Sequence, residues 1–367
     1  MPEKEVQLRA TIHYYGVLKL LKSMQTACLE GVRLFASDHR FRFYFALSLL
    51  FEGRLQESIR ELDSLQDKKD LSLGCYLALI HAHKTSKSPD VQACQDLETS
   101  LRENRRTASD EGLFFAGLVL LLTDKTDKAV EYLDKLLIKF PNYKDGRILR
   151  GWTDLVVRMQ SSSQTSSQTS SNYFEVSSKA GNVEGMLGQG MLSLVKGHPD
   201  MDLFSKLTSN WPNFIPGFIE SMKAFLHNKD WDAVLESSSK LMSLDRHSIE
   251  GLRFEILDAL VFKKHGNEYL ISRLKDLSTA LELREPKNGV LYLETSALLS
   301  SVCQCNPEVI RSTITLADRA ANLDPSFQVR TSNQVAKQHC YLNRISDAKR
   351  HFSNANKISP RDMNRSL

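Results

Sequence analysis

The residues best able to bind a metal ion form two short pairs, Cys303 with Cys305 and His81 with His83. Structural zinc sites need four ligands, as a rule from two such pairs, and no second pair accompanies the cysteines. The histidines lie two positions apart, so on a helix their side chains point in different directions. We therefore expect no metal site, and free, partly buried thiols at all the cysteines, which are Cys28, Cys75, Cys94, Cys303, Cys305 and Cys340.

The sequence also lacks a convincing motif for phosphate binding or for acyl transfer. Gly185, Gly188 and Gly190 resemble a glycine-rich phosphate loop, but no predicted strand precedes them. The sequence contains neither a Gly-x-Ser-x-Gly nor a His-Glu-x-x-His motif, and its carboxylates are distributed as on solvated helix faces. We therefore expect no enzyme, no cofactor and no catalytic residue.

Composition and charge narrow the class of protein further. Of the 367 residues 41% are hydrophobic, which is enough for a continuous core, and 48 Lys and Arg face 44 Asp and Glu. A net charge of +4 with both signs interspersed is too weak to indicate nucleic-acid binding. The longest apolar run, 112–122, is shorter than the roughly 20 residues that span a bilayer. With no hydrophobic signal core at the N-terminus, we expect a soluble, intracellular protein without a transmembrane segment.

Two sets of four residues share one spacing and indicate a repeat. Steps of 4, 3 and 5 positions separate the members of each set, which are Ala129, Leu133, Leu136 and Pro141, and Ala348, Phe352, Ala355 and Pro360. This is the pattern of the second helix of a tetratricopeptide repeat, a helix pair recurring every ~34 residues. Gly117 lies 24 positions before Pro141, and Gly188 lies 24 positions before Pro212. These small residues mark where the first helix of a pair lets the second approach closely.

Apolar residues recur at helical spacing along nearly the whole chain, which predicts an all-α fold. We expect a tetratricopeptide-repeat α-solenoid, a right-handed superhelix of antiparallel helix pairs, as a single array over 1–367. Further packing residues are Ala46, Ala320 and Pro325. The expected repeats are 8–36, 39–70, 71–106, 110–141, 144–180, 181–212, 214–246, 248–286, 288–325 and 329–360, followed by a flexible tail at 361–367.

Two local features of this array can also be predicted. Asp127 is a candidate N-cap for the second helix of the repeat 110–141. The Ser/Gln/Thr tract from Ser161 to Ser171 cannot bury enough apolar surface to order itself, so we expect a mobile loop inside one repeat. We interpret the tract as a neutral spacer, with phosphorylation as the alternative.

A solenoid of this kind offers a curved surface to other chains, and two functions suit it. The first is a subunit that holds a multiprotein assembly together. The second is an adaptor that grips a short peptide of a chaperone or other cytosolic partner with Lys and Asn at set points of the first helices. Only Asn333 and Lys337 are of the required type, since the other corresponding positions are Phe43, Leu47, Phe114, Leu118, Gly185 and Gln189. The sequence therefore favours the assembly subunit, with the peptide adaptor as the alternative.

Several short sequence strings resemble those of one protein family. The strings FRFY at 41–44 and LALIHAHK at 77–84 resemble the N-terminal part of the long tetratricopeptide-repeat subunit of intraflagellar transport complex A. The string WPNFIPGF at 211–218, followed by DWD at 230–232, is similar to a later stretch of that family. The resemblance runs in order from about residue 8 to residue 360 and so covers nearly the whole chain.

The resemblance implies a role and a place in the cell. Complex A works in retrograde transport with the dynein motor and helps membrane receptors to enter cilia, so the implied partners are the other complex A subunits, with membrane cargo only indirectly. The implied location is the cytoplasm, the ciliary base and the axoneme. Members of the family are far longer, which leads us to expect a fragment or short isoform whose last repeat exposes an apolar face.

Overall fold

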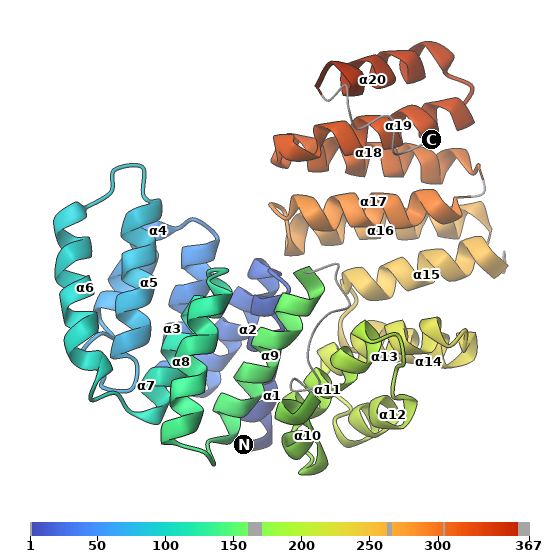
Figure 1. Cartoon of the computed structure of the whole chain (residues 1–367). Coiled ribbons are helices and arrows are strands. Elements are labelled where there is room, and N and C mark those ends of the chain that lie inside the picture. The colour runs from blue at the N-terminus through green and yellow to red at the C-terminus, as the bar shows by residue number, and fades with distance from the viewer. Residues whose placement is uncertain (1, 161–170, 263–265, 304, 359–367) are drawn as a thin grey trace. The chain divides into compact units, whose positions relative to one another are not determined.

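The structure, a computed structural model, describes residues 2–160, 171–262, 266–303 and 305–358. Within these ranges it consists of twenty α-helices and one short 3-10 helix, without a strand (Figure 1). Successive helices form hairpins that stack on their neighbours, which confirms the predicted all-α helical-repeat fold. No helix in the described part of the chain is long and apolar enough to cross a bilayer.

Contacts divide the chain into two compact units, Met1–Lys229 and Asp230–Leu367. The helices of the first unit are α1 (Pro2–Val17), α2 (Leu21–Leu34), α3 (His39–Phe51), α4 (Leu55–Asp63), α5 (Ser72–Thr85), α6 (Val91–Arg105), α7 (Asp110–Leu122), α8 (Thr126–Lys139), α9 (Lys144–Gln160), α10 (Ser171–Lys179), α11 (Val183–Val195), α12 (Met201–Asn210) and α13 (Ile215–His227).

The helices of the second unit are α14 (Trp231–Leu244), α15 (Ile249–Phe262), α16 (Asn267–Arg284), α17 (Gly289–Val302), α18 (Pro307–Leu323), η2 (Pro325–Phe327), α19 (Gln328–Tyr341) and α20 (Ile345–Ile358). The division falls inside the predicted repeat 214–246. Helix α13 packs on α11 and α12, whereas α14 packs on α15. The single array over 1–367 and the bounds of its repeats stay predictions.

Short polar side chains begin many of these helices. Each accepts a hydrogen bond from a backbone N–H two or three positions on, which satisfies a group that the helix leaves unpaired; the caps are Asp38, Asp90, Ser109, Asn182, Asp200, Asp230, Asn288 and Asn306. The prediction of Asp127 as an N-cap is wrong. Helix α8 already begins at Thr126, because Asp124 turns the chain with a φ of 59° and Lys125 becomes the N-cap, without a side-chain bond.

A left-handed residue ends seven of the described helices. It stands two positions past the last helical residue and has a φ between 57° and 82°, in the series Lys19, Gly53, Asp124, Gly181, Gly197, Lys229 and Asn343. Such a residue turns the chain out of the helix and closes the last hydrogen bonds. Gly53 adopts this conformation without the steric cost that a side chain brings.

The predicted mobile loop at 161–171 falls on residues outside the described ranges except for Ser171, the first residue of α10, and the predicted tail lies outside them entirely. In the second unit α20 buries Ala348 and Ala355. Its outward positions are mostly polar, with Ile345 and Ile358 as its exposed large apolar side chains in the described residues. The apolar last face expected from the sequence is therefore reduced to a few side chains.

Candidate functional site

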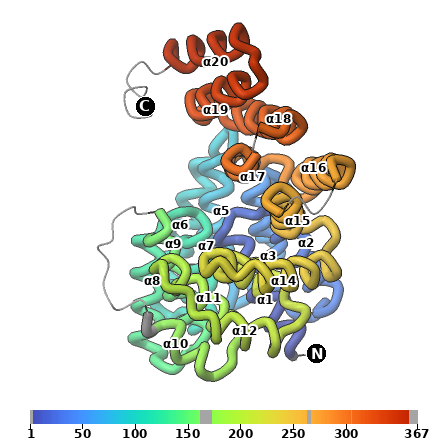
Figure 2. The backbone as a smooth tube through the Cα atoms, turned by 90° about the vertical axis from the view of Figure 1, so that its right-hand side faces the viewer, coloured from blue at the N-terminus to red at the C-terminus, as the bar shows by residue number. Residues whose placement is uncertain are grey.

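Within the first unit, α1 packs against helices that follow it by more than a hundred residues. Besides α2 it contacts α7, α11 and α13, and Figures 1 and 2 show it among the later helices of this unit. Leu8, Ile12 and Tyr14 of α1 are buried, and they belong to one hydrophobic core that extends to Ala224. The inner sides of α7, α11 and α13 are thus covered by the unit's own first helix.

A buried polar network joins α1 to this core. The His13 ring is 5% exposed; its Nδ1 lies 2.8 Å from Glu184 Oε1, and its Nε2 lies 3.1 Å from the Tyr44 hydroxyl. Trp152 Nε1 donates to the same Glu184 oxygen at 2.9 Å. A neutral ring with its proton on Nδ1 donates to the carboxylate and accepts from the hydroxyl, and a protonated ring donates to both. The network therefore has partners for His13 in either state.

Charge in this network is held by mutual pairing. Burial alone would raise the pKa of Glu184, but His13, Arg9 and the Trp152 hydrogen bond together hold that pKa below its ordinary value. Burial raises the pKa of the Tyr44 hydroxyl, so this group stays protonated. Burial acts to lower the pKa of Arg9, but the negative charges of Asp145 and Glu184 contribute to raising it above its ordinary value. The arginine therefore keeps its charge inside the unit.

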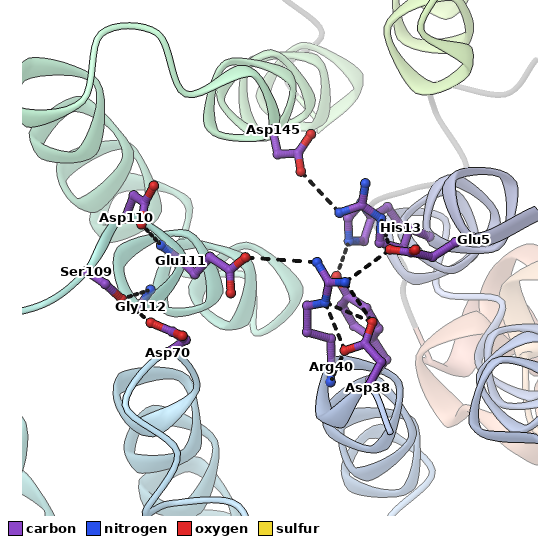
Figure 3. Close-up of polar contacts among 12 residues, drawn as sticks. Glu5, His13, Asp38, Arg40, Asp70, Ser109, Asp110, Glu111, Gly112 and Asp145 are labelled. Atoms are coloured by element: carbon purple, nitrogen blue, oxygen red, sulfur yellow. Dashed lines mark hydrogen bonds and ion pairs between the residues drawn. The ribbon is translucent and has the colours of Figure 1, made fainter. Parts of the chain in front are cut away.

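A second set of ion pairs surrounds Arg40, at the start of α3 (Figure 3). Its Nη2 lies 2.7 Å from Asp38 Oδ2 and 3.0 Å from Glu5 Oε1, and its Nη1 lies 3.9 Å from Glu111 Oε1. The hydrogen bond with Asp38 is the main cause of the raised pKa of Arg40. One guanidinium thus connects α1, α3 and α7.

Two further contacts reach across the unit from α1. Arg9 Nη1 lies 3.1 Å from Asp145 Oδ2 on α9, and the Tyr14 hydroxyl donates to Glu220 Oε1 on α13 at 2.6 Å. Lys223 Nζ also donates to Glu220 Oε1, at 2.7 Å. The carboxylates at this site face cations or hydrogen-bond donors, an arrangement that fixes helices in place rather than freeing a base for proton transfer.

The sequence-predicted packing residues lie where helices approach most closely. A Cβ atom on Gly117 would come within 2.8 Å of Leu133 Cδ2, and one on Gly188 within 2.2 Å of Phe174 Cε1. Glycine is thus the residue that fits at both positions. Six further predicted packing residues are buried, namely Ala46, Ala129, Leu133, Ala320, Ala348 and Ala355.

The other predicted packing residues are less enclosed. Pro141, Pro212 and Pro325 are exposed and follow the ends of α8, α12 and α18, where proline cannot continue a helix. Phe352 is half-buried. Pro360 lies outside the described residues.

Four of the six peptide-clamp positions of the first unit are buried, and of the other two Gly185 is buried while Gln189 is partly exposed. Phe43 and Leu47 are completely buried, as is Leu118, and Phe114 is 4% exposed. Among the described residues no three His, Cys, Asp or Glu side chains are placed to share a metal ion. The cysteines are free thiols, buried at 28, 75, 94 and 303 and exposed at 305 and 340.

Sequence reasoning missed the polar network. His13, Glu184 and Glu220 come from helices far apart in the sequence, and no motif connects them. A usable signal was present in α13, where Glu220 stands inside the apolar run of Phe218, Ile219 and Met222. A carboxylate on a buried helix face needs a partner, and this predicts an unidentified donor elsewhere in the chain.

Comparison with known proteins gives two consecutive family matches. The family described as "Tetratricopeptide repeat protein 21 N-terminal ARM repeat" matches residues 12–235, and "Tetratricopeptide repeat protein 21 second ARM domain" matches residues 272–367. The chain is 29% identical to human tetratricopeptide repeat protein 21B over 95% of its own length and 26% of the relative's. It is 31% identical to mouse tetratricopeptide repeat protein 21A over 89% of its length and 25% of the relative's. The chain thus spans about a quarter of these relatives.

A solved structure supports the fold alone. The human IFIT1 dimer with PPP-AAAA superposes with a TM-score of 0.51 at 10% identity, covering 92% of this chain and 94% of that one. At this identity the similarity concerns the arrangement of helices and not the function.

Proposed function

The chain belongs to the tetratricopeptide repeat protein 21 family, and we propose that it is a non-catalytic scaffold that acts as a subunit of intraflagellar transport complex A. Its task in that complex is retrograde ciliary transport and cilium assembly. Its partners are the other complex A subunits, at the ciliary base and along the axoneme.

The observation that carries this proposal is the match of the family over residues 12–235, and the packing of α1 against α7, α11 and α13 supports it. The polar groups inside that unit are used to hold helices, as the contacts of His13, Glu184 and Glu220 illustrate. Such an interior supports a rigid body that presents its outer surface to partners. The ciliary assignment itself rests on the resemblance of the sequence to the complex A subunit.

The alternative, an adaptor that clamps the terminal carboxylate of a peptide, has less support. Its clamp needs Lys and Asn on consecutive repeats, and the corresponding positions of the first unit hold buried Phe43, Leu47, Phe114 and Leu118. Micromolar binding of a peptide with a free acidic C-terminus, lost when that terminus is amidated, would restore this alternative.

Affinity purification of the tagged chain from ciliated cells tests the proposal. We expect the other complex A subunits to be recovered with it. The control variant Gly188→Leu, which overlaps the buried Phe174 ring, should unfold the first unit and lose them. A well-folded, well-expressed chain that recovers no complex A subunit contradicts the ciliary role and leaves the helical-repeat fold intact.

A further inference from the structure

The last helix pair carries the excess positive charge of the chain. Residues 328–358, which comprise α19 and α20 with their turn, contain six Lys and Arg and a single Asp, a net charge of +5. The whole chain has a net charge of +4, so the remaining residues nearly balance. Overall composition concealed this concentration of charge.

The basic side chains of this pair are all exposed, namely Arg330, Lys337, Arg344, Lys349, Arg350 and Lys357. Arg350 lies 3.4 Å from Asp347, the single acidic residue of the pair. In the described part of the chain, the other five have no carboxylate within ion-pair distance. Elsewhere in the described residues some exposed cations have such partners, as Lys84 does in Glu98 and Lys135 in Glu131.

The periodicity of the helices arranges these charges in rows. Arg330 and Lys337 are seven positions apart on α19, and Arg350 and Lys357 are seven apart on α20. Seven residues correspond to two turns, a distance of about 10.5 Å along one face. Figure 1 shows α19 and α20 as neighbours within the second unit, and they contact each other extensively. These two pairs, together with Arg344 in the turn and Lys349 beside Arg350, make up the basic surface.

We propose that this basic surface binds an acidic polypeptide segment, one rich in Asp and Glu, on a protein partner. The inference rests on the proposed scaffold function and adds the chemistry of one partner to it. Carboxylates spaced two turns apart on a partner helix match the spacing of the Lys and Arg pairs. Because five of the six side chains have no carboxylate partner within the described residues, binding forms new ion pairs at these five without breaking old ones.

A polypeptide fits this surface better than a bilayer or a nucleic acid does. The apolar side of α20 packs on α19, with Ala348 and Ala355 buried and Phe352 half-buried. Ile345 and Ile358 remain as its exposed large apolar side chains, too few to form a face that inserts into lipid. Tyr341 is the exposed aromatic ring of the pair, whereas single-stranded nucleic acids need several such rings for stacking.

Fluorescence anisotropy with the full chain tests the inference. The probe is a labelled peptide of Glu and Ala with an amidated C-terminus. In the test variant Lys337, Lys349 and Lys357 are each changed to Glu. In the matched control Lys68, Lys87 and Lys240, which are also exposed, are changed to Glu, so both variants have the same net charge. Circular dichroism melting verifies that both remain folded.

We expect the wild type and the control to bind the peptide, and the test variant to bind about 10- to 100-fold more weakly. Equal loss in both variants would show a response to net charge alone and overturn the inference. So would the absence of peptide binding, or binding only to phosphatidylserine vesicles or a DNA duplex measured in parallel. Recovery of complex A by a chain that binds no acidic peptide would reject this surface and keep the proposed function.

Discussion

The Tyr14 hydroxyl donates a 2.6 Å hydrogen bond to Glu220 Oε1, although 206 positions separate the two residues. Both side chains are almost completely buried, so this bond fastens the first helix of the first unit to its last. The same carboxylate accepts from Lys223, whose side chain is more exposed.

Changing Tyr14 to Phe should destabilise the first unit by about 1–3 kcal/mol, because Glu220 would stay buried with one donor fewer. Urea unfolding followed by circular dichroism measures the difference. Tyr341→Phe is the control, since that ring is 56% exposed and should leave stability unchanged. Equal stability of the Tyr14 variant and the wild type would show that the bond is not maintained in solution.

Glu184 should make the free energy of unfolding depend on pH in the acidic range. Its pKa is lower in the folded chain than in the unfolded chain, so the ionised carboxylate stabilises the fold at neutral pH. That stabilisation is complete above the unfolded value of about 4.3 and is lost as the pH falls through the folded pKa. Glu184→Gln should be less stable at pH 7 and show a smaller loss of stability below pH ~4.3 than the wild type. Exposed Glu103→Gln is the control in pH-resolved unfolding, and parallel curves for wild type and Glu184→Gln would refute this role.

Gly117 should not tolerate a large side chain. Its α-carbon faces Leu133, which is completely buried, so Gly117→Leu should overpack the α7–α8 contact at a cost of about 1–3 kcal/mol. Adding Leu133→Ala should recover part of this loss, because it makes room for the new side chain. Gly266→Ala is the control, since a Cβ there meets open space. An unchanged melting temperature for Gly117→Leu would count against the assigned contact.

Substitutions at the left-handed residues that follow helices should change stability in opposite directions, depending on whether glycine is removed or introduced. Gly53 has a φ of 82° with open space around it, so Gly53→Ala should cost about 1 kcal/mol through backbone strain alone. Lys229 has a φ of 60°, so Lys229→Gly should relieve strain and stabilise by up to about 1 kcal/mol. Thermal unfolding reports both, and a shift of the same sign for the two variants would be inconsistent with these turns.

Thiol reactivity should separate the cysteines by burial. Cys305 and Cys340 are exposed, whereas burial raises the pKa of the Cys28 and Cys75 thiols. Since the thiolate is the reactive form, an aromatic disulfide reagent should label the exposed pair first in the native chain. Mass spectrometry identifies the sites, and labelling of Cys28 as fast as Cys340 would show that the first unit opens.

The repeat pattern could be predicted because it is local. Helix periodicity, the Gly117 and Gly188 positions and the terminal prolines each lie within about 34 residues of the features they accompany. The predicted start of α8 was wrong because Asp124 has a left-handed backbone conformation. A glycine at this position would have indicated such a conformation, whereas an aspartate does not.

The candidate site could not be predicted, because its members meet through the curvature of the stack. His13 and Glu184 are 171 positions apart, and they meet because each helix pair between them is rotated relative to the one before. The sequence of a single pair does not show where the stack as a whole will lead. The division between α13 and α14 is equally hidden, since both helices have ordinary amphipathic sequences. The basic surface was readable in the sequence at 328–358 and was obscured by averaging charge over the whole chain.

The position of α1 has a consequence for biosynthesis. This helix is synthesised before its partners, since Glu184 follows His13 by 171 codons and Glu220 follows Tyr14 by 206 codons. At a translation rate of about 5–20 residues per second, these partners are synthesised roughly 10–40 s after α1. During that interval the apolar side of α1 lacks the later helices that bury it in the folded unit.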